Sequence, residues 1–316
     1  MRPAFSVLLL TTLIGAAQGL FLALYGASLG AQLDIVPRAP DSFFVVGGLV
    51  SVLLLVAGLG ASFFHLGRPE RAWRAASMWR TSWLSREVIV LPLFTGLVAL
   101  YALSHHPIGA ALGPASPWLG ALACAACLAL FVCTGMIYAC VRFLQEWASP
   151  LTVVNFVLLG CASGFTLATP LAAIWAPALT SLYGTGAVVL TAVAFLGRLS
   201  SLARNARLRP RSTLATAIGI KHPRIEQKAA GFLGGSFNTR EFRHGRTRKF
   251  VGHMRTAFLL FAFAVPVLLI AVGLEAGGVA WLALAFLVQY GGLLAERWFF
   301  FADANHPQNL YYEAIG

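Results

Sequence analysis

The stretch FFVVGGLVSVLLLVAGLGASFF, residues 43–64, holds no charged side chain, and the stretch that follows it, HLGRPERAWRAASMWRTSWLSRE, residues 65–87, holds five arginines. A further apolar run begins directly after Glu87. Over the whole chain of 316 residues, 59% are hydrophobic and 11% are charged, whereas about a quarter of the residues of a soluble domain are charged. The sequence therefore predicts an integral membrane protein.

Eight segments are long and apolar enough to cross a membrane as helices, for which roughly 20 mainly apolar residues are needed. They are residues 5–29, 43–64, 88–103, 118–141, 151–173, 182–199, 257–274 and 279–301. The third segment is the shortest and contains Pro92. The first differs from a secretory signal, because its apolar part is longer than the usual stretch of about 7 to 15 residues. We therefore expect an all-α membrane protein with eight transmembrane helices.

Positive charge lies almost entirely on one side of this arrangement. If Arg2 starts on that side, 22 of the 23 Lys and Arg residues fall there, and only Arg38 falls opposite. Because Lys and Arg are retained on the cytoplasmic side, both termini and the long loop of residues 201–256 are predicted to be cytoplasmic. The net charge of +12 is explained by the orientation of the chain in the membrane and by contact of its basic loops with anionic lipid headgroups. Nucleic acid is therefore not expected as a partner.

The remaining polar residues argue against several classes of site. All five cysteines fall in the fourth and fifth spans, where Cys behaves as a small apolar residue, and the pair Cys124 and Cys127 lacks the further ligands of a metal site. The seven histidines lie in loops or at helix ends, so we expect no haem and no metal in this chain. Nucleotide-binding, zinc-protease and serine-hydrolase motifs do not occur. Charged residues are nearly missing from the middle of the spans, which disfavours a transporter and predicts that any chemistry lies at helix ends.

The segment between the second and third spans is rich in arginine and tryptophan. Its spacing predicts an interfacial helix that starts at Pro69, with Glu70 and Arg74 one turn apart and with Trp79 and Trp83 at the level of the lipid headgroups. Such a helix could be a topology anchor and nothing more.

His65 and Glu87, which bracket this segment, favour a second interpretation. A histidine that titrates near neutrality and a carboxylate at a lipid-accessible edge are the groups that a quinone needs for coupled electron and proton transfer. From the residues alone, both interpretations stay open.

Four stretches resemble those of a known family. They are ASFFHLGRPERAWRA (61–75), TSWLSREVI (81–89), AERWFFF (295–301) and HPQNLYY (306–312). They resemble the membrane anchor subunit of dimethyl sulfoxide reductase and of related three-subunit molybdenum enzymes, over essentially the whole chain. The resemblance implies two packed four-helix groups in the bacterial inner membrane and a bound quinone, either ubiquinone or menaquinone. It also implies two partners, a four-cluster iron–sulfur subunit and a molybdopterin catalytic subunit.

The resemblance further implies roles for individual residues. His65 matches the histidine of the family's H-L-G-x-P motif, and Glu87 matches the glutamate of its L-S-x-E motif, both associated with the quinol site. The neighbours expected to assist in quinone binding or proton transfer are Arg68, Arg71, Trp73 and Arg86. The residues expected to hold the iron–sulfur partner are Arg74, Arg80, Asn238, Arg240 and Glu241. No residue of this chain is expected to act on a sulfur substrate.

A narrower resemblance concerns GGSFNTREFRHGRT (234–247) and TGMIYACVRFLQEWASPLTVVNF (134–156). Both are similar to the anchor subunits of cytoplasmic quinone-linked sulfite dehydrogenases, which favours sulfite oxidation with quinone as the electron acceptor. The basic loop of residues 201–256 is either a lipid-binding linker or a docking element that orders on its partner. An anchor for a quinol-dependent dimethyl sulfoxide or polysulfide reductase stays open as the alternative, and a transporter is less favoured.

Overall fold

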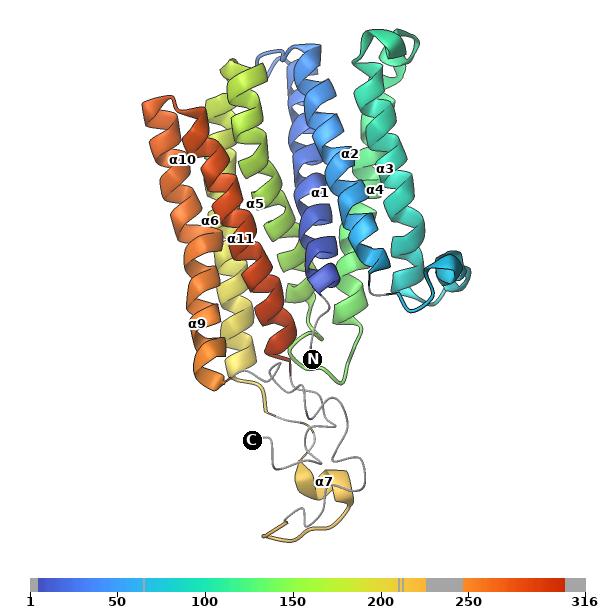
Figure 1. Ribbon diagram of the computed structural model, residues 1–316, viewed down its shortest axis with the longest axis vertical. Helices are drawn as coiled ribbons and strands as arrows, with labels where there is room; N and C mark the ends of the chain where they lie inside the picture. The colour runs from blue at the N-terminus through green and yellow to red at the C-terminus, as the bar shows by residue number, and fades with distance from the viewer. Residues whose placement is uncertain (1–4, 65, 210, 212, 226–246, 305–316) are drawn as a thin grey trace.

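The computed structural model describes residues 5–64, 66–209, 211, 213–225 and 247–304 (Figure 1). Within these ranges every regular element is a helix. The long helices are α1 (Phe5–Gln32), α2 (Asp41–Phe63), α3 (Trp83–Ser104), α4 (Ser116–Ala139), α5 (Pro150–Trp175), α6 (Thr180–Ala206) and α11 (Val279–Ala302). One further rod consists of α9 (Arg248–Leu259), the π-helical turn η5 (Leu260–Ala264) and α10 (Val265–Ala276). The short elements are η1 (Pro69–Met78), η2 (Pro107–Ala115), η3 (Pro177–Leu179) and α7 (Leu214–Ile218).

Eight helical segments of the described chain are long and apolar enough to span a membrane, as the sequence predicted. They lie side by side with their axes roughly parallel, and α1 and α5 occupy the middle of the bundle (Figure 1). On one side of this pair are α2, α3 and α4, and on the other are α6, α11 and the rod of α9 to α10. The division into two four-helix groups stays a prediction.

Several helices continue beyond the apolar stretches from which they were predicted. Helix α3 begins at Trp83, where the Ser82 hydroxyl accepts a hydrogen bond from the Ser85 amide at 3.3 Å. Helix α6 continues to Ala206 instead of ending near residue 199. The extra turns carry polar side chains. Those that face the protein are buried in its interior, whereas the sequence placed them in loops.

Helices α1 and α5 cross at a contact between glycines. Gly15 and Gly19 face Gly160 and Gly164, so each helix carries two glycines four residues apart. A Cβ atom at Gly19 would lie 2.8 Å from the carbonyl carbon of Gly160, which is too close for any side chain. Small residues at this spacing let helix backbones approach closely, which is how helices associate in lipid without a hydrophobic driving force.

The π-helical turn η5 also packs against a glycine. A Cβ at Gly292 of α11 would lie 2.7 Å from the Cα of Ala262. The Gln289 side chain donates hydrogen bonds to the carbonyl of Ala262 at 3.2 Å and to the hydroxyl of Thr191 at 3.1 Å. Since a π turn disturbs the regular ladder of backbone bonds, this buried amide satisfies a carbonyl that would otherwise face an apolar interior.

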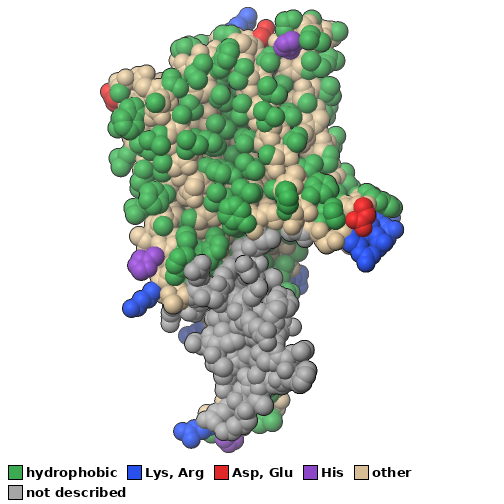
Figure 2. Space-filling model, in the orientation of Figure 1, with side chains coloured by type: hydrophobic (Ala, Val, Ile, Leu, Met, Phe, Trp, Pro, Cys, Tyr) green, Lys and Arg blue, Asp and Glu red, His purple; other side chains and the backbone are tan. Residues whose placement is uncertain are grey.

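The two ends of the bundle differ in charge. Exposed Lys and Arg side chains gather at the end where α1 begins and α11 ends, while the surface between the ends is largely hydrophobic (Figure 2). The same end carries η1 and the loop of residues 140–149 between α4 and α5. We call it the basic end.

Candidate functional site

The arginine-rich segment after α2 lies outside the bundle at the basic end (Figure 1). Its helix η1 is a 3-10 helix with no buried residue, not the α-helix on which the expected pairing of Glu70 with Arg74 depended. Instead, Glu70 forms an ion pair with its neighbour Arg71 at 3.8 Å, and both side chains are exposed. A helix begins at Pro69 as expected, and its interfacial position stays a prediction, but the pairing was wrong, because in a 3-10 helix side chains three residues apart are aligned.

Arginine and tryptophan alternate closely in this segment and contact one another. A guanidinium lies over an indole ring in three pairs: Arg74 over Trp73 at 5.4 Å, Arg80 over Trp79 at 5.3 Å, and Arg86 over Trp83 at 4.2 Å. Trp73 and Trp79 are exposed. Amphipathic rings with adjacent cations suit the boundary between lipid headgroups and water.

The described residues among those predicted for quinone binding do not come together into one pocket. His65 lies outside the described residues, as do Asn238, Arg240 and Glu241 of the predicted docking set. Arg68, Arg71, Trp73, Arg74 and Arg80 are exposed. Arg86 is half-buried and donates hydrogen bonds to the carbonyls of Trp79 at 2.9 Å and Arg80 at 2.8 Å, so it fixes the start of α3.

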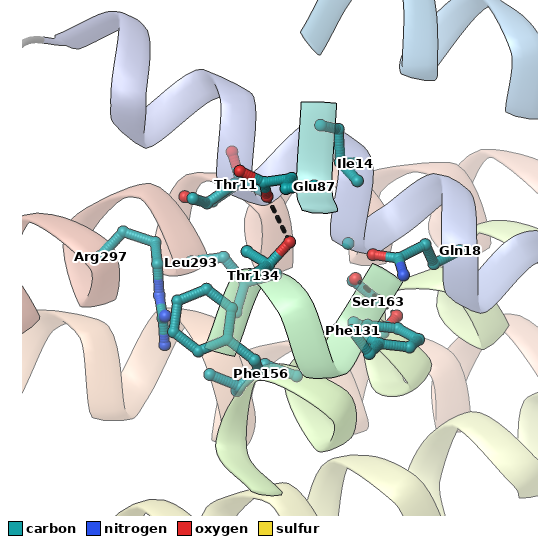
Figure 3. A pocket seen from close by; sticks show the side chains of 14 residues that line it. Thr11, Ile14, Gln18, Glu87, Phe131, Thr134, Phe156, Ser163, Leu293 and Arg297 are labelled. Atoms are coloured by element: carbon teal, nitrogen blue, oxygen red, sulfur yellow. Dashed lines mark hydrogen bonds between the residues drawn. The ribbon is translucent and has the colours of Figure 1, made fainter. Parts of the chain in front are cut away.

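Glu87 is the buried member of the predicted set. It lies one turn into α3 and is 6% exposed, and its carboxyl group accepts a hydrogen bond from the Thr134 hydroxyl of α4 (Figure 3). The expectation that this carboxylate lies at a lipid-accessible edge was therefore wrong. Glu87 is part of α3, and its side chain faces α4 and the cavity between the helices.

Glu87 borders a cavity of about 30 Å³ between α1, α3, α4, α5 and α11. Polar lining comes from Thr11, Thr12, Gln18, Thr134, Ser163 and Arg297, and apolar lining from Ile14, Phe131, Phe156, Leu159 and Leu293 (Figure 3). Gly15 and Gly160 complete the wall, so the cavity adjoins the glycine crossing. A water needs about 10 to 15 Å³ and two or more polar partners, so this space suits about two waters.

The volume of the cavity decides what it can hold. Pockets for small organic ligands are typically about 300 Å³ or larger. A quinone ring therefore does not fit beside Glu87 in this conformation, whereas water and a transferred proton do. The carboxyl group, the hydroxyls and the guanidinium that line the cavity have the chemistry to exchange and orient protons.

A buried ion cluster lies next to the cavity. The Glu296 carboxylate contacts the Nε atom of Arg198 at 2.7 Å and the Nε atom of Arg297 at 2.5 Å. All three side chains are buried, with exposed fractions of 5% or less. Arg198 and Arg297 were counted with the basic residues of one side of the membrane, at the ends of predicted spans, and in the structure both side chains lie inside the protein. The adjacent Glu and Arg within AERWFFF were the available signal, but the partner on α6 could not be read from spacing.

A second, larger hollow lies at the opposite end of the bundle. It has a volume of about 580 Å³ and is lined by residues that include Asp41, His105, His106 and Trp175. The His105 ring contacts the Asp41 carboxylate at 2.9 Å and the Ser116 hydroxyl at 3.0 Å. These contacts join the ends of α2, α3 and α4, and the hollow lies far from the arginine-rich segment along the helices.

Comparison with known proteins shows the family. Residues 2–303 match the family model described as "DMSO reductase anchor subunit (DmsC)". The chain belongs to this family. It is also 56% identical to a protein of Allochromatium vinosum that is named as a subunit of sulfite dehydrogenase, over an alignment that covers all of both chains. The family and the eight spanning helices make this chain a multi-pass membrane anchor subunit.

Proposed function

We propose that this chain is the membrane anchor and quinone-binding subunit of a complex of three subunits that oxidises sulfite to sulfate and passes the electrons to quinone. The partners are a four-cluster iron–sulfur subunit and a molybdopterin catalytic subunit, both bound at the basic end on the cytoplasmic side of the bacterial inner membrane. The identity to a sulfite dehydrogenase subunit supports the choice of substrate. The exposed arginines and tryptophans at the basic end support the position of the partners.

The single observation that carries the quinone assignment is the position of Glu87. This carboxyl group is buried one turn inside the basic end, near the surface where we place an electron donor, and anchoring alone does not call for a buried acid there. Reduction of quinone to quinol consumes two electrons and two protons. The overall reaction is sulfite, water and quinone giving sulfate and quinol, and the protons must be delivered where the electrons arrive.

A quinone can bind to the residues of this chain only if its ring lies outside the cavity. The cavity beside Glu87 is too small for the ring, but the surface at the end of α2 and along η1 offers exposed apolar and aromatic groups, among them Phe64, Leu66 and Trp73. When bound there, the quinone supplies the two-electron acceptor. Glu87 then holds a proton at its carboxyl oxygen, the Thr134 hydroxyl fixes that group in place, and the surrounding helices limit water to the small cavity.

The test is the substitution Glu87→Gln in the assembled complex. We expect sulfite-dependent quinone reduction to fall by about 100-fold, the scale for loss of a positioned acid–base group. Activity with a soluble dye that accepts electrons directly from the partner subunits should be unchanged. The control is Glu70→Gln, which removes an exposed carboxylate of η1 and should leave both activities intact.

Two results would contradict the proposal. If both activities of Glu87→Gln fall together, the residue supports assembly and not proton transfer. If quinone reduction keeps its full rate, the quinone is reduced elsewhere, and the hollow at the opposite end becomes the next place to look.

A further inference from the structure

A second small cavity lies beside the one that contains Glu87. It has a volume of about 10 Å³, room for about one water, and lies between the Glu87 cavity and the loop of residues 140–149. Both cavities are lined by Phe156 and Arg297, and the Arg297 guanidinium lies over the Phe156 ring at 4.2 Å. The two spaces therefore share the part of their walls that Phe156 and Arg297 form.

The walls of the second cavity are polar and carry unsatisfied groups. Asn155 donates a hydrogen bond to the Ser201 hydroxyl at 2.7 Å, but its own Oδ1 atom has no partner within the described part of the chain. The Nη1 atom of Arg297 is likewise without a described hydrogen-bond partner. Both side chains are at least 95% buried. Because buried polar atoms are nearly always paired, a water in this space is the simplest partner for an acceptor and a donor that share it.

The second cavity is also bordered by the loop at the basic end. Glu146 of this loop lines it and is partly exposed. Arg204 donates hydrogen bonds to the carbonyls of Gln145 at 3.0 Å and Ala148 at 3.3 Å, and Trp147 donates to the carbonyl of Phe300 at 3.0 Å. These bonds fasten the loop to α6 and α11, which holds Glu146 at the wall of the cavity.

The charges along this line allow a proton to pass. An unbalanced arginine would repel a proton, as it does in water channels. Here Glu296 neutralises one of the two guanidiniums and an ionised Glu87 balances the other, while Asp303 adds a further negative charge near Arg198. Uptake of a proton by the ionised Glu87 therefore does not require crossing an uncompensated positive charge.

We propose that the two cavities form a water-filled route that carries protons from the 140–149 loop to Glu87, with Arg297 and Phe156 as their shared wall. The route rests on the proposed function, in which Glu87 loses a proton to quinone as the quinone is reduced. Glu87 then regains its proton from the basic end, by way of Glu146 and the waters of the two cavities. Arg297 orients these waters and is not itself deprotonated.

The route can be blocked at the second cavity without touching Glu87. Ser201→Leu places an apolar side chain in a space that holds about one water. The matched control is Ser200→Leu, because Ser200 is the preceding residue on α6 and is exposed. Asn155→Leu, which removes the unsatisfied carbonyl oxygen, tests the same cavity from α5 in case Ser201→Leu does not fold.

The measurement is hydrogen–deuterium exchange of the Glu87 carboxyl in the intact complex, followed by infrared spectroscopy. The band of the protonated carboxyl is assigned by its loss in Glu87→Gln, and its shift after transfer to heavy water gives the rate of proton access. We expect Ser201→Leu or Asn155→Leu to slow the exchange by about 10-fold or more, with a matching fall in quinone reduction. Ser200→Leu should exchange at the native rate, and dye-linked activity should be unchanged in all variants.

Failure of the route and failure of the proposed function give different results. If Glu87→Gln abolishes quinone reduction but the blocked variants exchange at the native rate, the route is wrong and the function stands. If Glu87→Gln leaves quinone reduction intact, the proposed function is wrong whatever the exchange rates are.

Discussion

The glycine crossing of α1 and α5 gives the sharpest test of the packing. In the substitution Gly19→Ala, the added Cβ would lie 2.8 Å from the carbonyl carbon of Gly160 and 2.9 Å from the Cα of Cys161. Ordinary contact begins at 3.4 Å, so the two backbones would have to separate by at least about 0.6 Å along a packed interface. Overpacking of this kind typically costs about 1 to 3 kcal/mol, and here the obstructing atoms are backbone and cannot rotate away.

The control for this prediction lies on the same helix. Gly26 is exposed, and a Cβ at that position meets nothing within 4 Å. Alanine is favoured over glycine in a helix interior by up to about 1 kcal/mol, so Gly26→Ala should be neutral or stabilising. The free energy of unfolding is measured by titrating the purified chain in mild detergent with dodecyl sulfate and following tryptophan fluorescence. If Gly19→Ala and Gly26→Ala change the free energy of unfolding equally, the close crossing of α1 and α5 is refuted.

Two further predictions concern the ion cluster and the orientation. Arg198→Leu leaves the buried Glu296 without one of its two ion-pair partners and should destabilise the protein by about 3 to 5 kcal/mol in the same titration, whereas Arg71→Leu at the surface should change the stability by less than about 1 kcal/mol. If Arg198→Leu and Arg71→Leu lower the free energy of unfolding by similar amounts, the buried cluster contributes no more to stability than a surface ion pair does. A reporter that fluoresces only in the cytoplasm, fused to Gly316, should be bright, since 22 of the 23 Lys and Arg are predicted to be on that side. A dark fusion with intact expression would reverse the orientation and, with it, the position of the partners.

The eight spans could be predicted from the sequence because lipid leaves the backbone no partner outside its own helix, so apolar length is decisive. The ends of these helices could not be placed in the same way. Hydropathy records the side chain and not its neighbours, so Glu87 and the last polar turns of α6 were excluded from the spans, and the predicted span of residues 182–199 ended directly after Arg198. In the structure both residues lie in helices and are buried.

The candidate site shows the same limit. The sequence singled out Glu87 as a candidate but not its surroundings, because Thr134, which donates a hydrogen bond to it, and Arg297, which lines the same cavity, lie 47 and 210 residues away along the chain. The spacing of Gly15, Gly19, Gly160 and Gly164 was visible and could have predicted a close helix crossing. The pairing of Arg198 with Glu296 was not visible, since a single sequence does not show which polar residues face each other across α6 and α11.

The most direct measurement of the central claim compares the complex with and without this chain. Sulfite-dependent reduction of quinone and of a soluble dye is measured on the purified complex of all three subunits in lipid vesicles, and again on the two partner subunits after this chain has been removed. We expect the complete complex to reduce both acceptors, and the partner subunits alone to reduce the dye at full rate but not the quinone. Quinone reduction that continues undiminished without this chain would contradict the account.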